Sequence, residues 1–296
     1  MKLSVFLLCA AILFAQDDVV FRSGVSLVRV DAEAVDTNGR VVSGLTKDDF
    51  RVFDEDAPQP LVNFSFDVEP LDLILLFDTS GSMHNKLLNI VRAAELGFDE
   101  LHKTDRICVR SFNAESTEAQ AFTSDLQMVN EAILLRVLTL RFGGQSSLEP
   151  AADAAALRLR KEPTTHRKRA ILIITDKRGG RGLADKSIVR DLWSSDAVLS
   201  ELILDRAGPT KLLEKGANGL VDETGGATIV AGVPGDAFRD SVHYVRSGYA
   251  MYYALPDASP GSERRLRVEL TPEAARRLPN VRVRARSGYI VQPPAN

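Results

Sequence analysis

Short, almost uninterrupted apolar runs recur along the middle of this chain, and they restrict its fold more than any other feature of the sequence. The first covers residues 71–77 and contains one charged residue, Asp72; three more follow at 107–112, 170–175 and 197–204. Such runs are typical of strands buried on both faces of a parallel sheet. Stretches with helical periodicity lie between them, at 86–102, 125–138, 148–161, 186–193 and 210–223. The alternation predicts an α/β fold, with a doubly wound, mostly parallel sheet flanked by helices.

The flanks of this region have β character. Residues 28–34 alternate apolar and polar side chains, and residues 265–270 and 281–286 do so after a predicted helix at 236–246. The N-terminal flank is acidic, with 13 acidic and 5 basic residues between positions 17 and 72, whereas residues 262–286 contain eight Arg and three Glu. For the basic stretch, a solvated strand face is favoured over nucleic-acid binding, because interleaved aromatic residues and lysines are absent. A third interpretation is that it pairs with the acidic flank in one β module, into which the α/β domain is inserted.

The N-terminus has the pattern of a secretory signal peptide. Residues 1–15 combine Lys2 with an apolar run broken only by Ser4, and polar residues follow at once. A run of 13 residues is too short to span a bilayer, although a buried N-terminal strand or helix is the alternative. No second apolar run of about 18 residues follows, so we expect no transmembrane span in the mature chain and a secreted or periplasmic location.

These patterns divide the chain into four parts. We predict a signal peptide at 1–15, an N-terminal β segment at 16–69, the α/β domain at 70–231, and a C-terminal helix and β segment at 232–296 that packs with 16–69. The formal net charge of −3 argues against a nucleic-acid partner. Only Cys108 remains after the signal peptide, so the mature chain has no intramolecular disulfide.

A cluster of oxygen-bearing side chains follows the first buried strand. Asp78-Thr79-Ser80-Gly81-Ser82 places one carboxylate and two hydroxyls at alternate positions, with Gly81 allowing the turn to curl. In an open α/β sheet, ligands bind at the carboxyl ends of the strands. Carboxylate and hydroxyl oxygens suit Mg²⁺ or Mn²⁺ rather than zinc, and Ca²⁺ is a third candidate.

Two further segments complete the predicted site. Gly143-Gly144-Gln145-Ser146-Ser147 is a glycine turn that places hydroxyls just before a helix, and Thr175-Asp176 ends a second buried strand with a carboxylate. Both would lie on the same sheet edge as Asp78 if the strands are neighbours. The candidate metal-binding residues are therefore Asp78, Ser80, Ser82, Ser146 and Asp176.

The combination of the D-x-S-x-S motif, the G-G-x-[ST] turn and the strand-end T-D resembles the von Willebrand factor type A domain. The resemblance implies a metal-ion-dependent adhesion site in which Ser80 and Ser82 bind the metal directly, while Asp78 and Asp176 hold its waters. Ser146 stands where the family usually has Thr. Residues 44–54, 249–255 and 281–289 also resemble the flanks of this domain in a group of secreted bacterial proteins, so the likeness spans roughly residues 22 to 291.

The sequence departs from the family after the strand-end carboxylate. Lys177 replaces a frequent Gly, and Arg178 and Arg181 follow it. Cations beside a metal site lower its affinity for another cation. The alternative to an adhesion module is therefore an envelope scaffold with a degenerate, metal-free site, which binds through its β module.

Catalysis by a serine nucleophile is the remaining class of function to weigh. Ser80 lies in T-S-G-S rather than G-x-S-x-G, and the four histidines form no pattern of a base with an orienting partner. We therefore expect no enzymatic activity. The sequence favours an exported, metal-dependent binding module that accepts an Asp or Glu from a protein partner.

Overall fold

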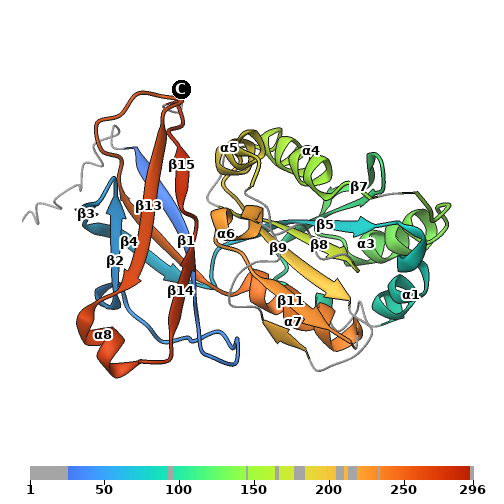
Figure 1. Cartoon of the computed structure of the whole chain (residues 1–296), viewed down its shortest axis with the longest axis horizontal. Helices are drawn as coiled ribbons and strands as arrows, with labels where there is room; N and C mark the ends of the chain where they lie inside the picture. The colour runs from blue at the N-terminus through green and yellow to red at the C-terminus, as the bar shows by residue number, and fades with distance from the viewer. Residues whose placement is uncertain are drawn as a thin grey trace, which may run out of the picture.

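The computed structural model of the chain describes residues 26–92, 97–144, 146–163, 167–176, 184–204, 210–212, 219–232 and 234–293. Two lobes lie side by side, an all-β lobe and an α/β lobe (Figure 1). The predicted signal peptide and the basic residues Lys177, Arg178 and Arg181 fall outside the described residues. Among the helices that are described, none is long and apolar enough to cross a membrane.

A seven-stranded sheet forms the centre of the α/β lobe, with the strand order β10-β11-β9-β8-β5-β6-β7. The five central strands are parallel, whereas the edge strands β7 and β10 are antiparallel to their neighbours. The bounds are β5 Leu71–Asp78, β6 Arg106–Phe112, β7 Ser116–Thr123, β8 Lys168–Thr175, β9 Ala197–Leu204, β10 Lys211–Leu212 and β11 Thr228–Ala231. The predicted doubly wound sheet is confirmed.

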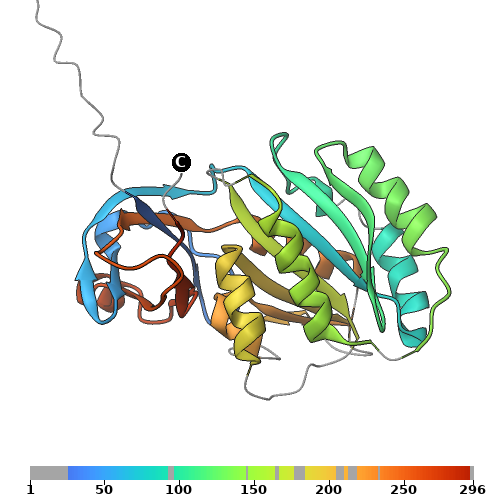
Figure 2. The ribbon, with the colours of Figure 1, turned by 90° about the horizontal axis from the view of Figure 1, so that it is seen from above.

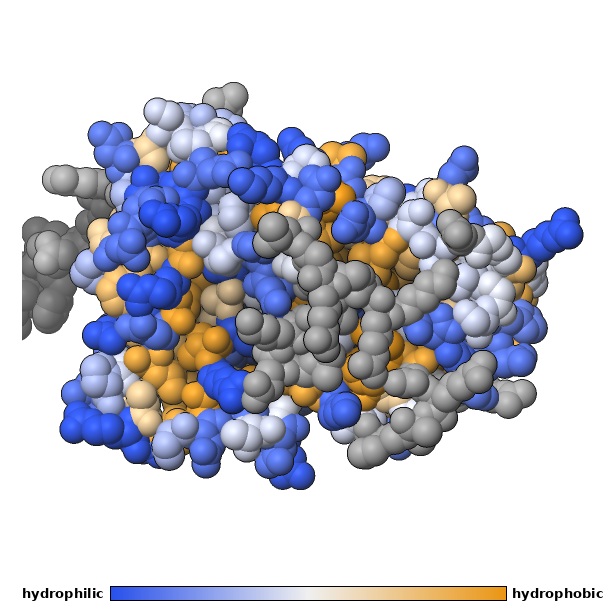
Figure 3. All heavy atoms as spheres, viewed as in Figure 1, coloured by the Kyte–Doolittle hydropathy of each residue, from blue (hydrophilic) through white to orange (hydrophobic). Residues whose placement is uncertain are grey.

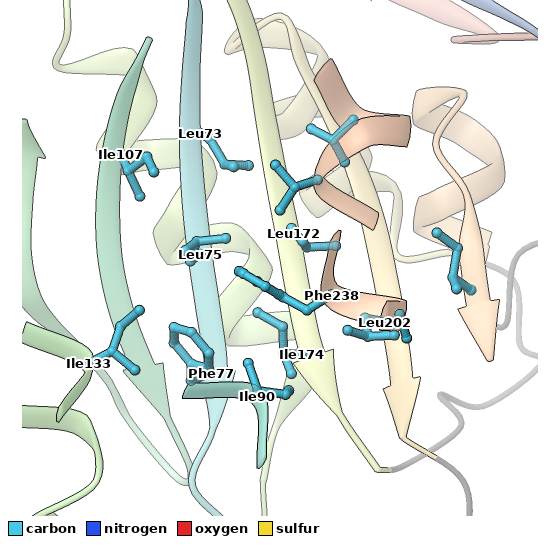
Figure 4. Packing of buried hydrophobic residues seen from close by; sticks show 14 of the residues in the cluster. Leu73, Leu75, Phe77, Ile90, Ile107, Ile133, Leu172, Ile174, Leu202 and Phe238 are labelled. Carbon is cyan, nitrogen blue, oxygen red and sulfur yellow. The ribbon is translucent and has the colours of Figure 1, made fainter. Parts of the chain in front are cut away.

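Helices cover both faces of this sheet (Figures 1 and 2). Their bounds are α1 His84–Arg92, α3 Leu126–Ala132 with a π-helical turn at Ile133–Val137, α4 Leu148–Arg160, α5 Lys186–Ser194, α6 Gly219–Thr224 and α7 Pro234–Arg246. Side chains alternate along each strand, so Leu73, Leu75 and Phe77 of β5 pack with α1, α3 and α7 (Figure 4). Ile74 and Leu76 point to the other face and pack with α4, α5 and α6. Burial on both faces explains why these strands are continuously apolar.

Two elements of this lobe differ from the sequence-based expectation. Residues Lys211–Leu212 form the edge strand β10, although they fall in a predicted helix at 210–223. Helix α7 packs on β9, β11 and α1 through Phe238 and Val242, so it belongs with the sheet rather than with the C-terminal β segment to which the sequence analysis assigns it. The helix was expected, but sequence alone does not say which of the two lobes its apolar face covers.

The N- and C-terminal segments build the all-β lobe together from two four-stranded sheets. The strand orders are β14-β1-β12-β4 and β15-β13-β2-β3, so each sheet contains strands from both ends of the chain. The bounds are β1 Leu27–Val35, β2 Phe50–Asp54, β3 Ala57–Gln59, β4 Leu61–Phe66, β12 Tyr249–Ala254, β13 Glu263–Leu270, β14 Arg282–Ala285 and β15 Gly288–Ile290. A short helix that the sequence analysis misses, α8 Pro272–Arg277, separates β13 from β14.

Acidic and basic residues from the two ends of the chain pair within this lobe. Asp54 is fully buried and accepts hydrogen bonds from Arg264 at 2.7 Å, Tyr253 at 2.8 Å and Tyr289 at 2.9 Å. Asp49 pairs with Arg277 at 2.6 Å. The basic C-terminal stretch therefore neutralises the acidic N-terminal flank, as one of the sequence-based interpretations requires.

Specific contacts join the two lobes. Arg286 of the β lobe pairs with Asp196 at 2.6 Å. The buried Glu33 carboxylate lies 3.5 Å from Lys168 of β8 and accepts a hydrogen bond from Tyr244 of α7 at 3.3 Å. A Cβ added to Gly225 would lie 2.3 Å from the backbone of Ala285, so the two lobes are in close backbone contact at this point.

Candidate functional site

Asp78 joins two of the predicted site segments at the carboxyl edge of the sheet. It is the last residue of β5, is fully buried, and sits next to the end of β8 because Phe77 pairs with Ile174. Its Oδ1 accepts a hydrogen bond from the Ser80 backbone N–H at 2.8 Å, and its Oδ2 accepts one from Thr175 Oγ1 at 2.6 Å. Asp78 therefore holds the turn after β5 against the end of β8.

Ser80 presents a buried hydroxyl that is not satisfied. The residue is 2% exposed, and its Oγ has no hydrogen-bond partner among the residues that the structure describes. Leaving such a group unpaired in the interior costs about 1–3 kcal/mol. An unpaired hydroxyl beside a buried carboxylate is a donor set that suits a hard divalent cation. The buried Ser80 hydroxyl and the neighbouring Asp78 carboxylate therefore fit a hard divalent cation.

Ser82 lies further out, on the 3₁₀ turn Gly81–Met83 that leads into α1, and it is exposed. The role expected for Gly81 is not supported. Its φ is not positive, and an added Cβ would meet nothing within 4 Å, so the turn does not require glycine.

The glycine turn is fastened directly beside the turn after β5. Gly143 N–H donates to the Thr79 carbonyl at 3.1 Å, and Ser147 N–H donates to the Asn113 carbonyl at 2.9 Å. Gly144 has φ +75°, a conformation that favours glycine. Ser146 lies half-buried between these two anchors, just before α4 begins at Leu148. The structure thus brings the second predicted segment to the same edge as the first.

Asp176 follows the last residue of β8 and is engaged by a cation from the chain itself. Its Oδ2 lies 2.8 Å from Lys86 Nζ, and its side chain is 8% exposed. Lys86 also donates to the Leu204 carbonyl at the end of β9, at 3.0 Å. Lys86 is not among the site residues predicted from the sequence. Its position four residues after Ser82, in the first turn of a helix that begins at this edge, is the signal that could have found it.

The three segments therefore meet at one edge of the sheet, over the ends of β5, β6, β8 and β9. We call this region the rim: Asp78, Ser80, Ser82, Ser146, Asp176 and Lys86. The two carboxylates and the one ammonium give it a formal net charge of −1. No group of three or more His, Cys, Asp or Glu within the described ranges is arranged to hold a metal, so a metal here depends on hydroxyl oxygens.

Comparison with known proteins identifies the region that contains the rim. Residues 73–180 match the von Willebrand factor type A domain. No curated protein sequence matches the chain.

Solved structures with a similar architecture include a von Willebrand factor type A protein from Catenulispora acidiphila. It is 10% identical to this chain with a TM-score of 0.46, and the match covers 92% of this chain and 76% of that one. Manganese-loaded TRAP protein from Plasmodium vivax is 13% identical with TM-score 0.46, over 71% of this chain and 96% of that one. An aerotolerance-related membrane protein from Bacteroides fragilis is 18% identical with TM-score 0.46, over 59% and 98%. At these identities and scores the likenesses carry no information about function.

Proposed function

This chain contains a von Willebrand factor type A domain, and we propose that it is an exported binding module whose rim holds Mg²⁺ or Mn²⁺ and accepts an acidic residue of a protein partner. The observation that carries the proposal is the unpaired, buried Ser80 hydroxyl next to Asp78. Ser80, Ser82 and Ser146 would hold the ion through their hydroxyls, and Asp78 and Asp176 would balance its charge. When bound, the ion supplies a Lewis-acid position that attracts a carboxylate.

The chain's own residues prepare this site before any ligand arrives. Asp78 is held by Ser80 N–H and by Thr175 Oγ1, so its position does not depend on a ligand. The hydrogen bond from Gly143 to Thr79 keeps the glycine turn beside it. A site whose donors are already held in place loses little conformational entropy when it binds.

Exposed apolar side chains in the segment that leads to the glycine turn support a protein partner. Eight large apolar residues are exposed among those described, and four of them lie in the segment of α3 and its π-helical turn that leads to Gly143: Met128, Leu134, Leu135 and Leu140. Leu135 is 67% exposed. Exposed apolar side chains that cluster, rather than scatter, mark interaction surfaces.

The metal site is tested with one serine substitution and a matched control. Ser80→Ala removes an oxygen that has no partner among the described residues, so the metal-free variant should be at least as stable as wild type while its affinity for Mn²⁺ falls. Ser241→Ala removes another buried hydroxyl, one that is bonded to the Ala237 carbonyl on α7 at 2.7 Å, and should not change Mn²⁺ affinity. Calorimetric titration measures both. In thermal unfolding, Mn²⁺ at about 100 times its Kd should add about 2.7 kcal/mol to wild type.

The open coordination position is tested separately with a defined carboxylate. Water proton relaxation by the Mn²⁺-loaded protein reports the waters that the ion retains. A short peptide with one Asp should lower the relaxation enhancement, because its carboxylate displaces a water, whereas the same peptide with Asn should not. Equal effects of the two peptides, or no Mn²⁺ binding by wild type at millimolar concentration, would exclude the proposal.

A second candidate function has its own support. The groove between β13, α8 and β14 measures about 580 Å³ and is lined by Val268, Leu270, Val281 and Val283 together with Arg51 and Glu269. Figure 3 shows apolar side chains gathered over this part of the β lobe. Together with the Lys86–Asp176 pair on the rim, the groove favours an envelope scaffold that binds through its β module without a metal. Wild type that binds no Mn²⁺ would favour this alternative.

A further inference from the structure

Lys86 occupies an unusual position for a lysine. It lies in the first turn of α1, His84–Arg92, where the partial positive charge of the helix N-terminus disfavours a cation. Its ammonium nevertheless contacts two acceptors across the rim, Asp176 Oδ2 at 2.8 Å and the Leu204 carbonyl at 3.0 Å. These contacts join the start of α1 to the ends of β8 and β9. The two contacts therefore hold the Lys86 ammonium over the rim, although the charge of the helix N-terminus disfavours it there.

We propose that the Lys86 ammonium is a tethered counter-ion that competes with a divalent cation for Asp176. In the metal-free protein it pairs with Asp176, whose side chain is only 8% exposed, so the pair offsets the cost of keeping this carboxylate away from water. When a divalent cation binds, Lys86 leaves Asp176 and its ammonium enters solvent. The inference rests on the metal site of the proposed function and adds the residue that sets the affinity of that site.

The charges of the rim give the direction of the effect. Without Lys86, the carboxylates of Asp78 and Asp176 together match the charge of one divalent cation. With Lys86 in place, the cation meets a net charge of −1 and an ammonium that already holds one of the two carboxylates. The ammonium and a divalent cation bound to the same carboxylate repel each other, and the repulsion is strongest in a partly buried site. The ammonium therefore lowers metal affinity, by about ten-fold or more on the scale of typical coupling between two ligands.

The competition can be measured on the full chain with Mn²⁺ alone. Calorimetric titration should show that Lys86→Gln binds Mn²⁺ about ten-fold more tightly than wild type, and thermal unfolding in EDTA should show that this variant melts at a lower temperature. Lys161→Gln is the matched control, because Lys161 is exposed and lies before β8, at the opposite edge of the sheet. It makes the same change of charge and should leave both quantities unchanged.

Release of Lys86 can also be measured on the wild-type protein, without any substitution. Acetylation of lysine amines by an N-hydroxysuccinimide ester, followed by peptide mass spectrometry, should label Lys86 faster with Mg²⁺ than with EDTA, because the ammonium is released from Asp176. Labelling of Lys161 should be the same in both. Equal labelling of Lys86 with and without a bound metal would overturn the proposal.

The outcomes separate this proposal from the proposed function. If wild type and Lys86→Gln bind Mn²⁺ with equal affinity, the tethered counter-ion is wrong and the metal-dependent function stands. If only Lys86→Gln binds Mn²⁺, the counter-ion is upheld and the metal-dependent function of the natural chain is rejected. If neither binds Mn²⁺, both are rejected.

Discussion

Thr175 Oγ1 donates a 2.6 Å hydrogen bond to Asp78 Oδ2, and this bond ties the end of β8 to the end of β5. Both residues are buried, and Asp78 has no exposed surface. The bond therefore connects two site segments that are 97 residues apart in sequence. Its geometry makes the threonine of the strand-end T-D pair a structural support for the rim rather than an additional candidate for holding the metal.

Replacing this threonine should destabilise the chain. Thr175→Val keeps the shape of the side chain but leaves Asp78 Oδ2 in the interior without its hydroxyl donor. We expect the free energy of unfolding to fall by about 1–3 kcal/mol, measured by urea denaturation. Thr175→Ser restores the hydroxyl and should recover most of the loss. If Val and Ser have the same effect, the hydrogen bond is not the source of the stabilisation.

The burial of Cys108 gives a simple test of how the lobe opens. Burial, with Glu118 nearby, raises the pKa of the Cys108 thiol to about 12, and the side chain is fully buried in β6. Because the thiolate is the reactive form, Ellman's reagent should not react with the folded protein at pH 8, and should react within seconds in denaturant. Rapid reaction of the folded protein would show that β6 and β7 separate readily.

How far the sequence predicts this molecule depends on how each element is buried. The strands β5 and β8 are buried on both faces, so their composition identifies them without any other information. The edge strand β7, Ser116–Thr123, is half exposed and reads as a polar loop. The helix α8 has six residues inside an arginine-rich strand segment, too few for a clear helical period.

The candidate site likewise has features that the sequence predicts and features that it does not. The order Asp78, Ser80, Ser82 is local in sequence, and Asp176 can be placed at the same edge because β5 and β8 are both predicted to be parallel strands. The contact between Lys86 and Asp176 cannot be predicted, because it depends on the direction in which α1 leaves the rim. An unpaired Ser80 hydroxyl likewise follows only from packing that the sequence does not show.

The junction between the lobes should make stability depend on pH through Glu33. Burial raises the pKa of Glu33 from its ordinary value of 4.5 to about 7, although the Lys168 ammonium acts in the opposite direction. The folded chain therefore keeps a proton on this carboxyl that the unfolded chain loses above pH 4.5. The contribution to stability is fully present below pH 4.5 and is lost as pH rises through 7.

The pKa shift of Glu33 also gives the size of the pH-dependent change in stability. A shift from 4.5 to about 7 corresponds to about 3 kcal/mol between pH 4 and pH 8, measured by urea denaturation across this range. Glu33→Gln should remove this component of the pH dependence. Glu263→Gln, at an exposed carboxylate paired with Arg190, should not change it. A Glu33→Gln chain with the pH profile of wild type would show that Glu33 does not titrate in this range.

Two glycines with the same backbone conformation allow the cost of a left-handed residue to be separated from a steric clash between the lobes. Gly225 has φ +78° and Gly261 has φ +81°, so an alanine at either position incurs the cost of a left-handed residue, about 1–2 kcal/mol. At Gly261 an added Cβ meets nothing within 4 Å, whereas at Gly225 it would lie 2.3 Å from the backbone carbonyl carbon of Ala285 and 2.5 Å from Arg286 N. Gly225→Ala must therefore push β14 away from the α/β lobe.

We expect Gly261→Ala to lower the free energy of unfolding by the backbone cost alone. Gly225→Ala should lower it by about 1–3 kcal/mol more, because it also overpacks the contact with Ala285. Because Arg286 pairs with Asp196 next to this contact, Gly225→Ala should also increase amide hydrogen exchange at residues 282–286. Urea denaturation and hydrogen exchange with mass spectrometry measure the two effects. Equal destabilisation by the two alanines would mean that the lobes separate freely at this junction, and that the rim and the β lobe are not held in a fixed arrangement.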